Sequence, residues 1–127
     1  MENCVFCKII KGEIPAVKIW EDEKHIAMLD INPIKPGHVL LIPKKHSEYI
    51  FDLDDKEYNL LMVKAKEIAK KLKLKLNSKR IGLAIEGFGV PHIHVHLIPI
   101  DKENDLNSKR MRPLSAEELN KMADKLK

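Results

Sequence analysis

The sequence predicts an α+β domain built on a five-stranded antiparallel sheet with helices packed on one face. Three observations predict this class. Five short segments are rich in Ile, Val and Leu, and most of their connections are short and polar, as antiparallel pairing requires. A long stretch after the third segment repeats apolar residues at helical spacing. A second helical stretch ends the sequence. We therefore expect a meander of strands covered by helices.

The first half of the chain supplies a short helix and three strands. The helix is expected over residues 5–10, where Phe6 and Ile9 would point inward. A polar turn over 22–24 separates the first two strands, and the third lies between Gly37 and Pro43. The three strands are expected over residues 17–21, 25–31 and 38–43.

The second half of the chain supplies the two long helices and the last two strands. Asp54 can cap a helix over 54–76, with Glu57 three residues later. Ser115 and Glu118 form a capping box that begins the C-terminal helix. Strands are expected over 80–86 and 92–99, and a polar loop over 102–112. The apolar stripe of the first helix consists of Leu61, Ala65, Ile68, Ala69, Leu72 and Leu76.

Length and composition favour one small domain over residues 1–127, with a core over about 4–107 and the C-terminal helix over about 115–126. The sequence has no apolar run near 18 residues and no signal peptide, so we expect a cytoplasmic protein without a membrane partner. The net charge is +4, but both signs are spread along a chain that is 33% charged. This distribution favours a solvated surface over a specific nucleic-acid site.

Three histidines occupy alternate positions of an apolar run: His92, His94 and His96. In a β-strand such side chains share one face and follow each other at about 6.6 Å. A structural role would require a separate hydrogen-bond partner for each buried ring, which makes it the weaker interpretation. A row of imidazoles suits either a metal ion or a phosphate group that one ring attacks and its neighbours bind.

The sequence resembles the histidine triad (HIT) superfamily, and within it the branch of histidine triad nucleotide-binding proteins. The resemblance extends over nearly the whole chain and follows the order of the family's segments. The matching segments are the N-terminal signature over 4–16, the central stretches over 30–33 and 36–46, and the triad block over 91–99.

The resemblance implies a HIT-like fold and a nucleotide hydrolase or transferase that cleaves at the α-phosphate. AMP-type substrates are expected: nucleoside phosphoramidates, adenylylated molecules and, as a close variant, dinucleoside polyphosphates. His94 matches the nucleophile, which would form a nucleotidyl-histidine. His96 would bind the phosphate or the leaving group, and His38 would orient the nucleophile. The family also implies a purine nucleotide as ligand and a homodimer.

The same resemblance suggests the nucleotide pocket. Asp30 matches the residue that accepts hydrogen bonds from the ribose hydroxyls. The backbone N–H groups of Gly89 and Val90 could face the phosphate, whereas Pro91 has none. Many members have a Gly-Gln-Ser or Gly-Gln-Thr motif before the triad, but this loop is shorter and has no hydroxyl. This departure affects the expected rate and leaving group rather than the reaction class. The residues matching base-lining positions are Phe6, Ile9, Met28 and Ile31, which are core residues by default.

A zinc site is the preferred interpretation of the Cys-x-x-Cys pair. Cys4 and Cys7 can place two thiolates on one tetrahedral ion. Several family branches complete such a site with histidines that match His46 and His92. This structural Zn²⁺ would have no open position for water, and the chemistry would require no cofactor. Free thiols and a redox pair remain alternatives.

Two further functions remain open at this stage. The first is a non-catalytic nucleotide-binding or scaffold protein that keeps the fold and uses a dimer surface for partners. The second is a zinc hydrolase in which His92, His94 and His96 together hold the metal.

Overall fold

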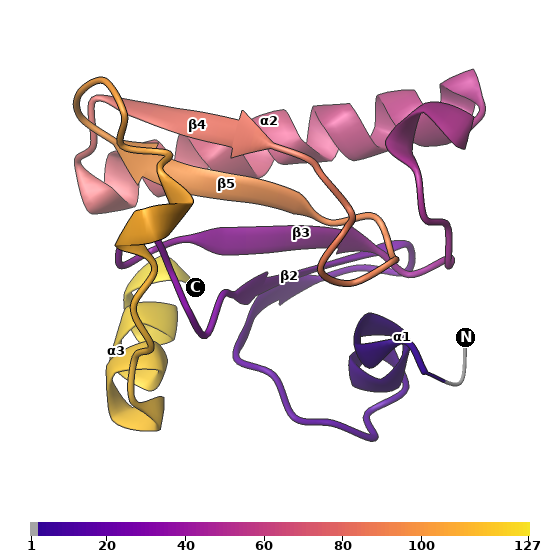
Figure 1. The fold of residues 1–127 in the computed structure, drawn as a ribbon, viewed down its shortest axis with the longest axis horizontal. Helices are drawn as coiled ribbons and strands as arrows, with labels where there is room; N and C mark the ends of the chain where they lie inside the picture. The colour runs from indigo at the N-terminus through magenta and orange to yellow at the C-terminus, as the bar shows by residue number, and fades with distance from the viewer. Residues whose placement is uncertain (1–2) are drawn as a thin grey trace.

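The strands form one antiparallel sheet in the order β1-β2-β3-β5-β4 in a computed structural model, which describes residues 3–127 (Figure 1). The predicted α+β class with a five-stranded antiparallel sheet is confirmed. Residues 1 and 2 of the predicted domain lie outside the described residues. The strands are β1 (Lys18–Glu21), β2 (His25–Leu29), β3 (Val39–Pro43), β4 (Arg80–Ala84) and β5 (Val95–Ile100).

The strand order differs from the expected meander because β5 lies between β3 and β4. Helix α2 (Asp55–Leu76) connects β3 to β4 and carries the chain across the sheet to its edge. The β4–β5 connection then returns the chain into the open position beside β3. Leu97 consequently pairs with Val39 on one side and with Leu83 on the other. The strand that follows the histidine row is therefore central in the sheet.

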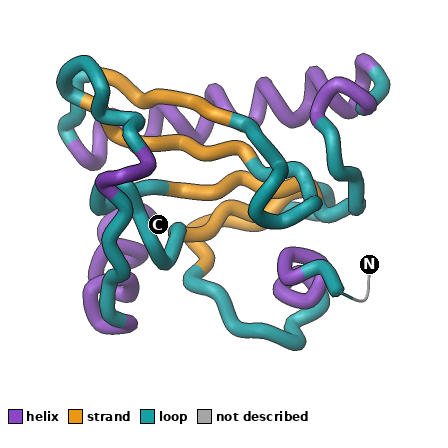
Figure 2. Tube along the Cα trace, in the orientation of Figure 1, coloured by secondary structure: helices purple, strands orange, loops and turns teal. Residues whose placement is uncertain are grey.

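The two long helices cover one face of the sheet, and the short first helix lies on the other (Figures 1 and 2). Helices α2 and α3 (Ala116–Leu126) pack against the larger core, as predicted. Helix α1 (Val5–Ile10) packs against the opposite face, so the expectation of one helical face does not extend to it. Two short 3₁₀ helices, Ile50–Asp52 and Ser108–Arg110, interrupt the loops.

The two long helices begin at the predicted caps. The Asp54 carboxylate accepts the backbone N–H of Glu57 at 2.7 Å. Ser115 and Glu118 make both bonds of the capping box. Asn77 ends α2 in the left-handed conformation, with φ of 52°. The buried residues of these helices are Leu61, Ala65, Ile68 and Leu72 in α2, and Leu119, Ala123 and Leu126 in α3.

Helix α1 is held by a second, smaller core. Phe6 and Ile9 are buried, as predicted. The Cys4 thiol accepts the backbone N–H of Cys7 at 3.3 Å and caps the helix. Alternation along β2 and β3 places Ile26, Met28, Leu40 and Ile42 in this core. The second face of the sheet therefore carries α1 beside the histidine row.

The last strand begins at Val95 rather than at His92, and Pro43 explains the difference. Leu41 pairs with Val95, so continued pairing would place Ile93 opposite Pro43. Proline has no N–H to donate to a ladder. The N–H of Ile93 bonds the carbonyl of Ser47 instead, at 2.8 Å. His92 and His94 therefore lie in an irregular segment before the strand.

Across residues 3–127, no helix is long and apolar enough to cross a membrane.

Candidate functional site: two histidine clusters

His94 is fixed in one tautomer by the backbone beside it. Its Nδ1 lies 2.7 Å from the carbonyl oxygen of His92. A carbonyl only accepts, so Nδ1 carries the proton and donates it. In the neutral ring, Nε2 therefore carries the lone pair. The ring is 7% exposed and packs edge-on against Phe6, with ring centroids 4.9 Å apart. This is the protonation state that a nucleophilic imidazole needs.

His96 has the opposite tautomer because of a relay through His38. The backbone N–H of Ile34 donates to His38 Nδ1 at 3.1 Å, which leaves the proton of the neutral ring on Nε2. This Nε2 donates to His96 Nδ1 at 2.9 Å. In the neutral ring of His96 the proton is therefore on Nε2. The rings of His94 and His96 are 4.9 Å apart. One acceptor nitrogen and one donor nitrogen thus lie on neighbouring rings.

Asp30 lies at the same cluster, at the end of β2. One carboxylate oxygen accepts the backbone N–H of Asn32 at 2.8 Å, and the other lies 3.5 Å from His38 Nε2. Burial lowers the pKa of His38 to about 4, although the charge of Asp30 opposes the shift. Burial also lowers the pKa of His96, with a smaller contribution from His94. Both rings are therefore neutral at pH 7, as the two tautomers require.

His92 belongs to a different cluster, which it forms with Cys4, Cys7 and His46. Its Nε2 donates to the carbonyl of Pro43 at 2.8 Å, so Nδ1 keeps the lone pair. Burial lowers the pKa of His92 and keeps the ring neutral. The structure therefore divides the predicted row: His92 faces the cysteines, whereas His94 and His96 lie beside Asp30 and His38. The four ligand atoms Sγ, Sγ, Nδ1 and Nδ1 lie within 4.8 Å of one another.

The distances in this Cys–His cluster fit tetrahedral zinc. His92 Nδ1 lies 3.3 Å from Cys4 Sγ and 3.5 Å from Cys7 Sγ. His46 Nδ1 lies 3.2 Å from Cys7 Sγ and 3.2 Å from His92 Nδ1. Usual Zn–S and Zn–N bonds separate S from N by about 3.5 Å and N from N by about 3.3 Å in a tetrahedron. The bond from His92 to Pro43 is the kind of outer contact that orients a metal-binding ring.

The alternative explanations for the cysteines and the histidine row fit these contacts less well. Burial raises the pKa of the Cys7 thiol, whereas a redox-active thiol needs a lowered one. A site formed by His92, His94 and His96 would need three converging nitrogens. The Nδ1 atoms of His92 and His94 are instead directed to the Cys–His cluster and to a carbonyl.

The predicted base-lining residues differ in exposure. Phe6, Ile9 and Met28 are buried in the core beneath α1, at 6%, 7% and 3% exposure. The ring of Phe6 packs edge-on against the rings of His92 and His94. Ile31 is 61% exposed next to Asp30. Ile31 is therefore an accessible apolar side chain, whereas Phe6 supports the ring of His94.

The short loop before the triad presents unused backbone donors. Val90 packs against the core beneath α1, and its carbonyl accepts the N–H of His92 at 2.8 Å. In the described part of the chain, the N–H groups of Gly89 and Val90 donate to no protein acceptor. Gly87 has φ of +82°, and a side chain there would approach the carbonyl of Glu48. The loop thus keeps a tight turn and leaves two N–H groups for an anion.

Sequence reasoning missed one group of residues that supports the site. Asp105 is 1% exposed, and its carboxylate accepts Lys35 at 2.7 Å and Arg110 at 3.0 Å. The hydrogen bond from Lys35, together with those from the backbone N–H groups of Asp101 and Lys102, keeps the pKa of Asp105 well below its usual range. The carbonyl of Lys35 accepts the N–H of His38, so this buried ion pair holds the loop that orients the relay. The polar segment 102–112 contained no local signal of it.

Comparison with known proteins identifies the class. The HIT domain family model matches residues 11–103. An uncharacterized HIT-like protein of Borreliella burgdorferi is 40% identical over 125 residues, covering 92% of this chain and 89% of that protein. An adenosine 5′-monophosphoramidase of Candida albicans is 39% identical over 109 residues, covering 76% and 70%.

Solved structures agree with this comparison. A HIT-like protein from Bartonella henselae superposes with a TM-score of 0.86 at 31% identity, covering 99% of this chain and 95% of that one. A Zn-bound histidine triad family protein from Mycobacterium smegmatis has a TM-score of 0.79 at 31% identity, covering 98% and 94%. The fold and the paired histidine clusters define a histidine triad domain. The chain belongs to the HIT family.

Proposed function

We propose that the protein hydrolyses AMP-type nucleotides at the α-phosphate through a nucleotidyl-histidine intermediate. Nucleoside phosphoramidates are the preferred substrates. The observation that carries the proposal is the pair of opposite tautomers: His94 offers a lone pair on Nε2, and neighbouring His96 offers a proton on Nε2. A nucleophile and a hydrogen-bond donor for the leaving group are thus set side by side. The phosphoramidase name of the related Candida albicans protein supports the same chemistry.

The first step would transfer the nucleotidyl group to the protein. Nε2 of His94 attacks the α-phosphorus, and the new P–N bond forms as the bond from phosphorus to the leaving amine breaks. The Nε2–H group of His96 donates a hydrogen bond to the leaving nitrogen, which takes a proton from solvent and leaves as the amine. The N–H groups of Gly89 and Val90 would bind the charged phosphoryl oxygens.

The second step would hydrolyse this intermediate. The oxygen of a water molecule attacks phosphorus and its proton passes to solvent. The P–N bond to His94 breaks and AMP leaves, so the ring recovers its lone pair. Asp30 would bind the ribose hydroxyls throughout, because its carboxylate lies at the same cluster.

We further propose that the Cys–His cluster holds a structural zinc ion. Cys4, Cys7, His46 and His92 would supply all four ligands. When bound, such an ion cross-links a fold without entering the reaction. Here the ligands come from α1, the segment after β3 and the segment before β5. The ion would therefore tie α1 to the strand that carries His96.

The homodimer implied by the family also remains a proposal, as does the cytoplasmic location. Strand β4 lies at the edge of the sheet, and an open edge is a template for pairing with another chain. Leu83 on β4 is 42% exposed and Val63 on α2 is 56% exposed, which gives this side an apolar character. Sedimentation analysis would show a species of about twice the mass of 14.6 kDa, near 29 kDa, if this edge pairs.

The proposed reaction can be tested by trapping the intermediate. The protein is incubated with adenosine phosphoramidate, quenched rapidly and analysed by intact mass. We expect an adduct of one AMP on the wild type and none on His94→Ala. An adduct that persists in a folded His94→Ala protein would overturn the assignment of the nucleophile. Absence of both adduct and turnover, with AMP still bound, would favour the non-catalytic alternative. Loss of turnover on chelation in a protein that stays folded would favour the zinc hydrolase.

A further inference from the structure

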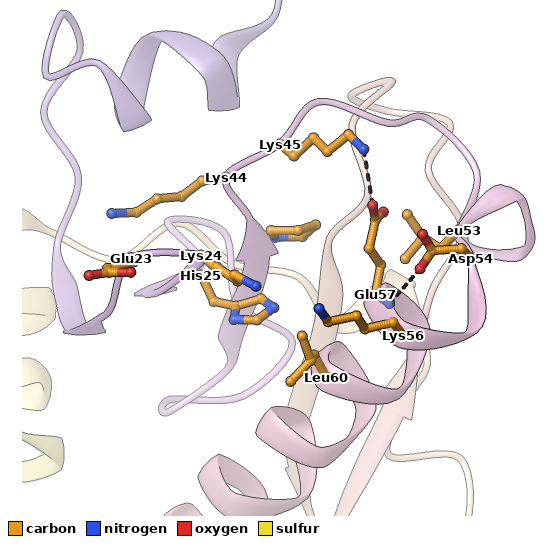
Figure 3. Close-up of a pocket in the computed structure, with 11 residues that line it drawn as sticks. Glu23, Lys24, His25, Lys44, Lys45, Leu53, Asp54, Lys56, Glu57 and Leu60 are labelled. Atoms are coloured by element: carbon orange, nitrogen blue, oxygen red, sulfur yellow. Dashed lines mark hydrogen bonds and ion pairs between the residues drawn. The ribbon is translucent and has the colours of Figure 1, made fainter.

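A pocket lies on the α2 side of the sheet, opposite the face that carries His94 and His96 (Figure 3). It has a volume of about 430 Å³ and lies between the first turns of α2 and the adjoining ends of β2 and β3. None of the residues assigned to the reaction or to the Cys–His cluster lines it. The lining residues are Glu23, Lys24, His25, Pro43, Lys44, Lys45, Leu53, Asp54, Lys56, Glu57 and Leu60.

His25 has hydrogen-bonding capacity that the described protein does not use. The residue is 6% exposed, and its Nδ1 is buried without a hydrogen-bond partner among residues 3–127. The nearest carboxylate oxygen, on Asp22, is 3.7 Å away and too distant for a hydrogen bond. Buried polar atoms without partners are rare because each one lowers the stability of the fold. An imidazole in this state on a pocket wall points to a ligand.

Two of the four lysines that line the pocket form ion pairs with carboxylates. Lys44 pairs with Glu21 at 2.7 Å, outside the pocket, and Lys45 pairs with Glu57 at 3.0 Å. The Asp54 carboxylate is used to cap α2.

Lys24 and Lys56 have no carboxylate within ion-pair distance in the described chain. In Figure 3 both side chains extend toward His25, whereas Glu23 points away from it. The interior of the pocket is therefore positively charged.

The remaining wall is apolar. Pro43 contributes from β3, Leu53 from the segment just before α2, and Leu60 from α2 itself. Leu60 is 40% exposed, so its side chain is available to a bound molecule. A ligand that uses the whole pocket needs a charged head and an apolar body.

We propose that this pocket binds a small organic phosphate independently of the reaction at His94. The phosphoryl oxygens would lie among Lys24, His25 and Lys56, where two ammonium groups and an imidazole N–H can donate. The organic body would pack on Leu53 and Leu60. This site is separate from the α-phosphate position in the proposed function, so either proposal can fail without the other.

Phenylphosphonate is a suitable probe, because it has the charged head and the apolar body and cannot be hydrolysed. It is titrated into ¹⁵N-labelled protein in the presence of saturating AMP, which occupies the triad face. We expect saturable shifts of amides at 23–25 and 53–60. The double variant Lys24→Met, Lys56→Met should raise the dissociation constant at least about tenfold, because two charge-assisted contacts are lost.

Matched controls separate a site from general charge. Lys66 and Lys73 are exposed and line no part of this pocket. The double variant Lys66→Met, Lys73→Met removes the same charge and should change the dissociation constant less than about twofold. His25→Phe keeps an aromatic ring without nitrogen atoms and should weaken binding about threefold or more. AMP binding and turnover should be unchanged in all three variants.

Four results would overturn the proposal. Shifts confined to residues 87–96 would place the probe at the triad face. Equal weakening in the control variant would show unspecific attraction to lysines. Equal binding of benzyl alcohol would show an apolar pocket without an anion site. Unsaturable shifts would show no site at all.

Discussion

The two histidine clusters lie side by side on one face of the sheet, yet their rings are oriented for different tasks. In the Cys–His cluster the free nitrogens of His46 and His92 converge on a common point with two thiols. In the second cluster, His94 and His96 each use one nitrogen for a fixed internal bond. Their other nitrogens carry opposite protonation.

The difference shows how the fold assigns roles to identical side chains. His92 donates through Nε2 to the carbonyl of Pro43, whereas His94 donates through Nδ1 to the carbonyl of His92. The nitrogen that is left over is therefore different in each ring. The contact behind the ring decides whether its free nitrogen suits a metal, an attack or a hydrogen bond to a leaving group.

The largest effect on turnover is expected when the proposed nucleophile is replaced. We expect His94→Ala to lower turnover of an adenosine phosphoramidate by about 10⁴-fold or more, because the covalent route is lost. AMP binding, zinc content and melting temperature should stay close to wild type. Steady-state kinetics, calorimetry and metal analysis give these values. Turnover within tenfold of wild type would reject the nucleophile.

Substitutions in the Cys–His cluster are expected to act mainly on zinc content and thermal stability. Cys4→Ser should remove most of the zinc, expected near one per chain, and lower the melting temperature by about 10 °C or more, because the cross-link is lost although the serine hydroxyl can still cap α1. His46→Ala should behave alike. Turnover should fall only in step with the fraction of molecules that keep α1 folded onto the sheet, because the metal takes no part in the reaction. Metal-free protein with unchanged melting temperature would contradict a structural zinc.

Acid should weaken the fold through the relay. The pKa of His38 falls from 6.5 to about 4 on burial, so the unfolded chain binds more protons in that interval. Stability from this ring is complete above pH 6.5 and decreases as the pH falls toward about 4, by about 3 kcal/mol. Denaturation at several pH values measures the slope. His38→Gln should reduce it, and an equal slope in that variant would contradict the assignment.

The smallest effect is expected at the sugar. Asp30→Ala should weaken AMP binding by about 1.5–3 kcal/mol, the range for hydrogen bonds to a charged acceptor. A 2′,3′-dideoxy analogue should lose a similar amount on wild type. The two losses should not add when combined, because they remove the same contacts. Additive losses in calorimetry would show that Asp30 does not bind the ribose.

Local signals in the sequence predicted much of the fold. Helix α1 has the predicted bounds. The caps at Asp54 and Ser115 could be predicted because each uses two residues three positions apart in the sequence. The set of residues near the site was also predicted by resemblance to the HIT family. The same resemblance implied that His92 joins the cysteines while His94 and His96 serve the reaction, whereas strand alternation alone predicts a single row. The contact that turns His92 away from that row, its bond to the distant Pro43, has no local signal in the sequence.

Other features depend on pairings that no local pattern contains. The position of β5 between β3 and β4 follows from the path of α2. The buried Asp105 meets Lys35 across 70 positions of sequence. His25 lies in a predicted strand, and no sequence pattern distinguishes it from its neighbours. The pocket beside it is formed by residues at the start of α2, which are distant in the sequence. Alternation predicts which face a side chain occupies, but not which element covers it.

If the Cys–His cluster holds zinc and the second cluster binds a nucleotide, as we propose, helix α1 would let the metal influence nucleotide affinity without any contact to the phosphate. Six residues are too few for a helix to persist alone. Its docked population depends on the buried Phe6 and Ile9 and on the two thiols. Phe6 supports the ring of His94, so only docked molecules have a complete site. The observed dissociation constant is then the intrinsic one divided by the docked fraction, and metal supply would set the active fraction of the protein.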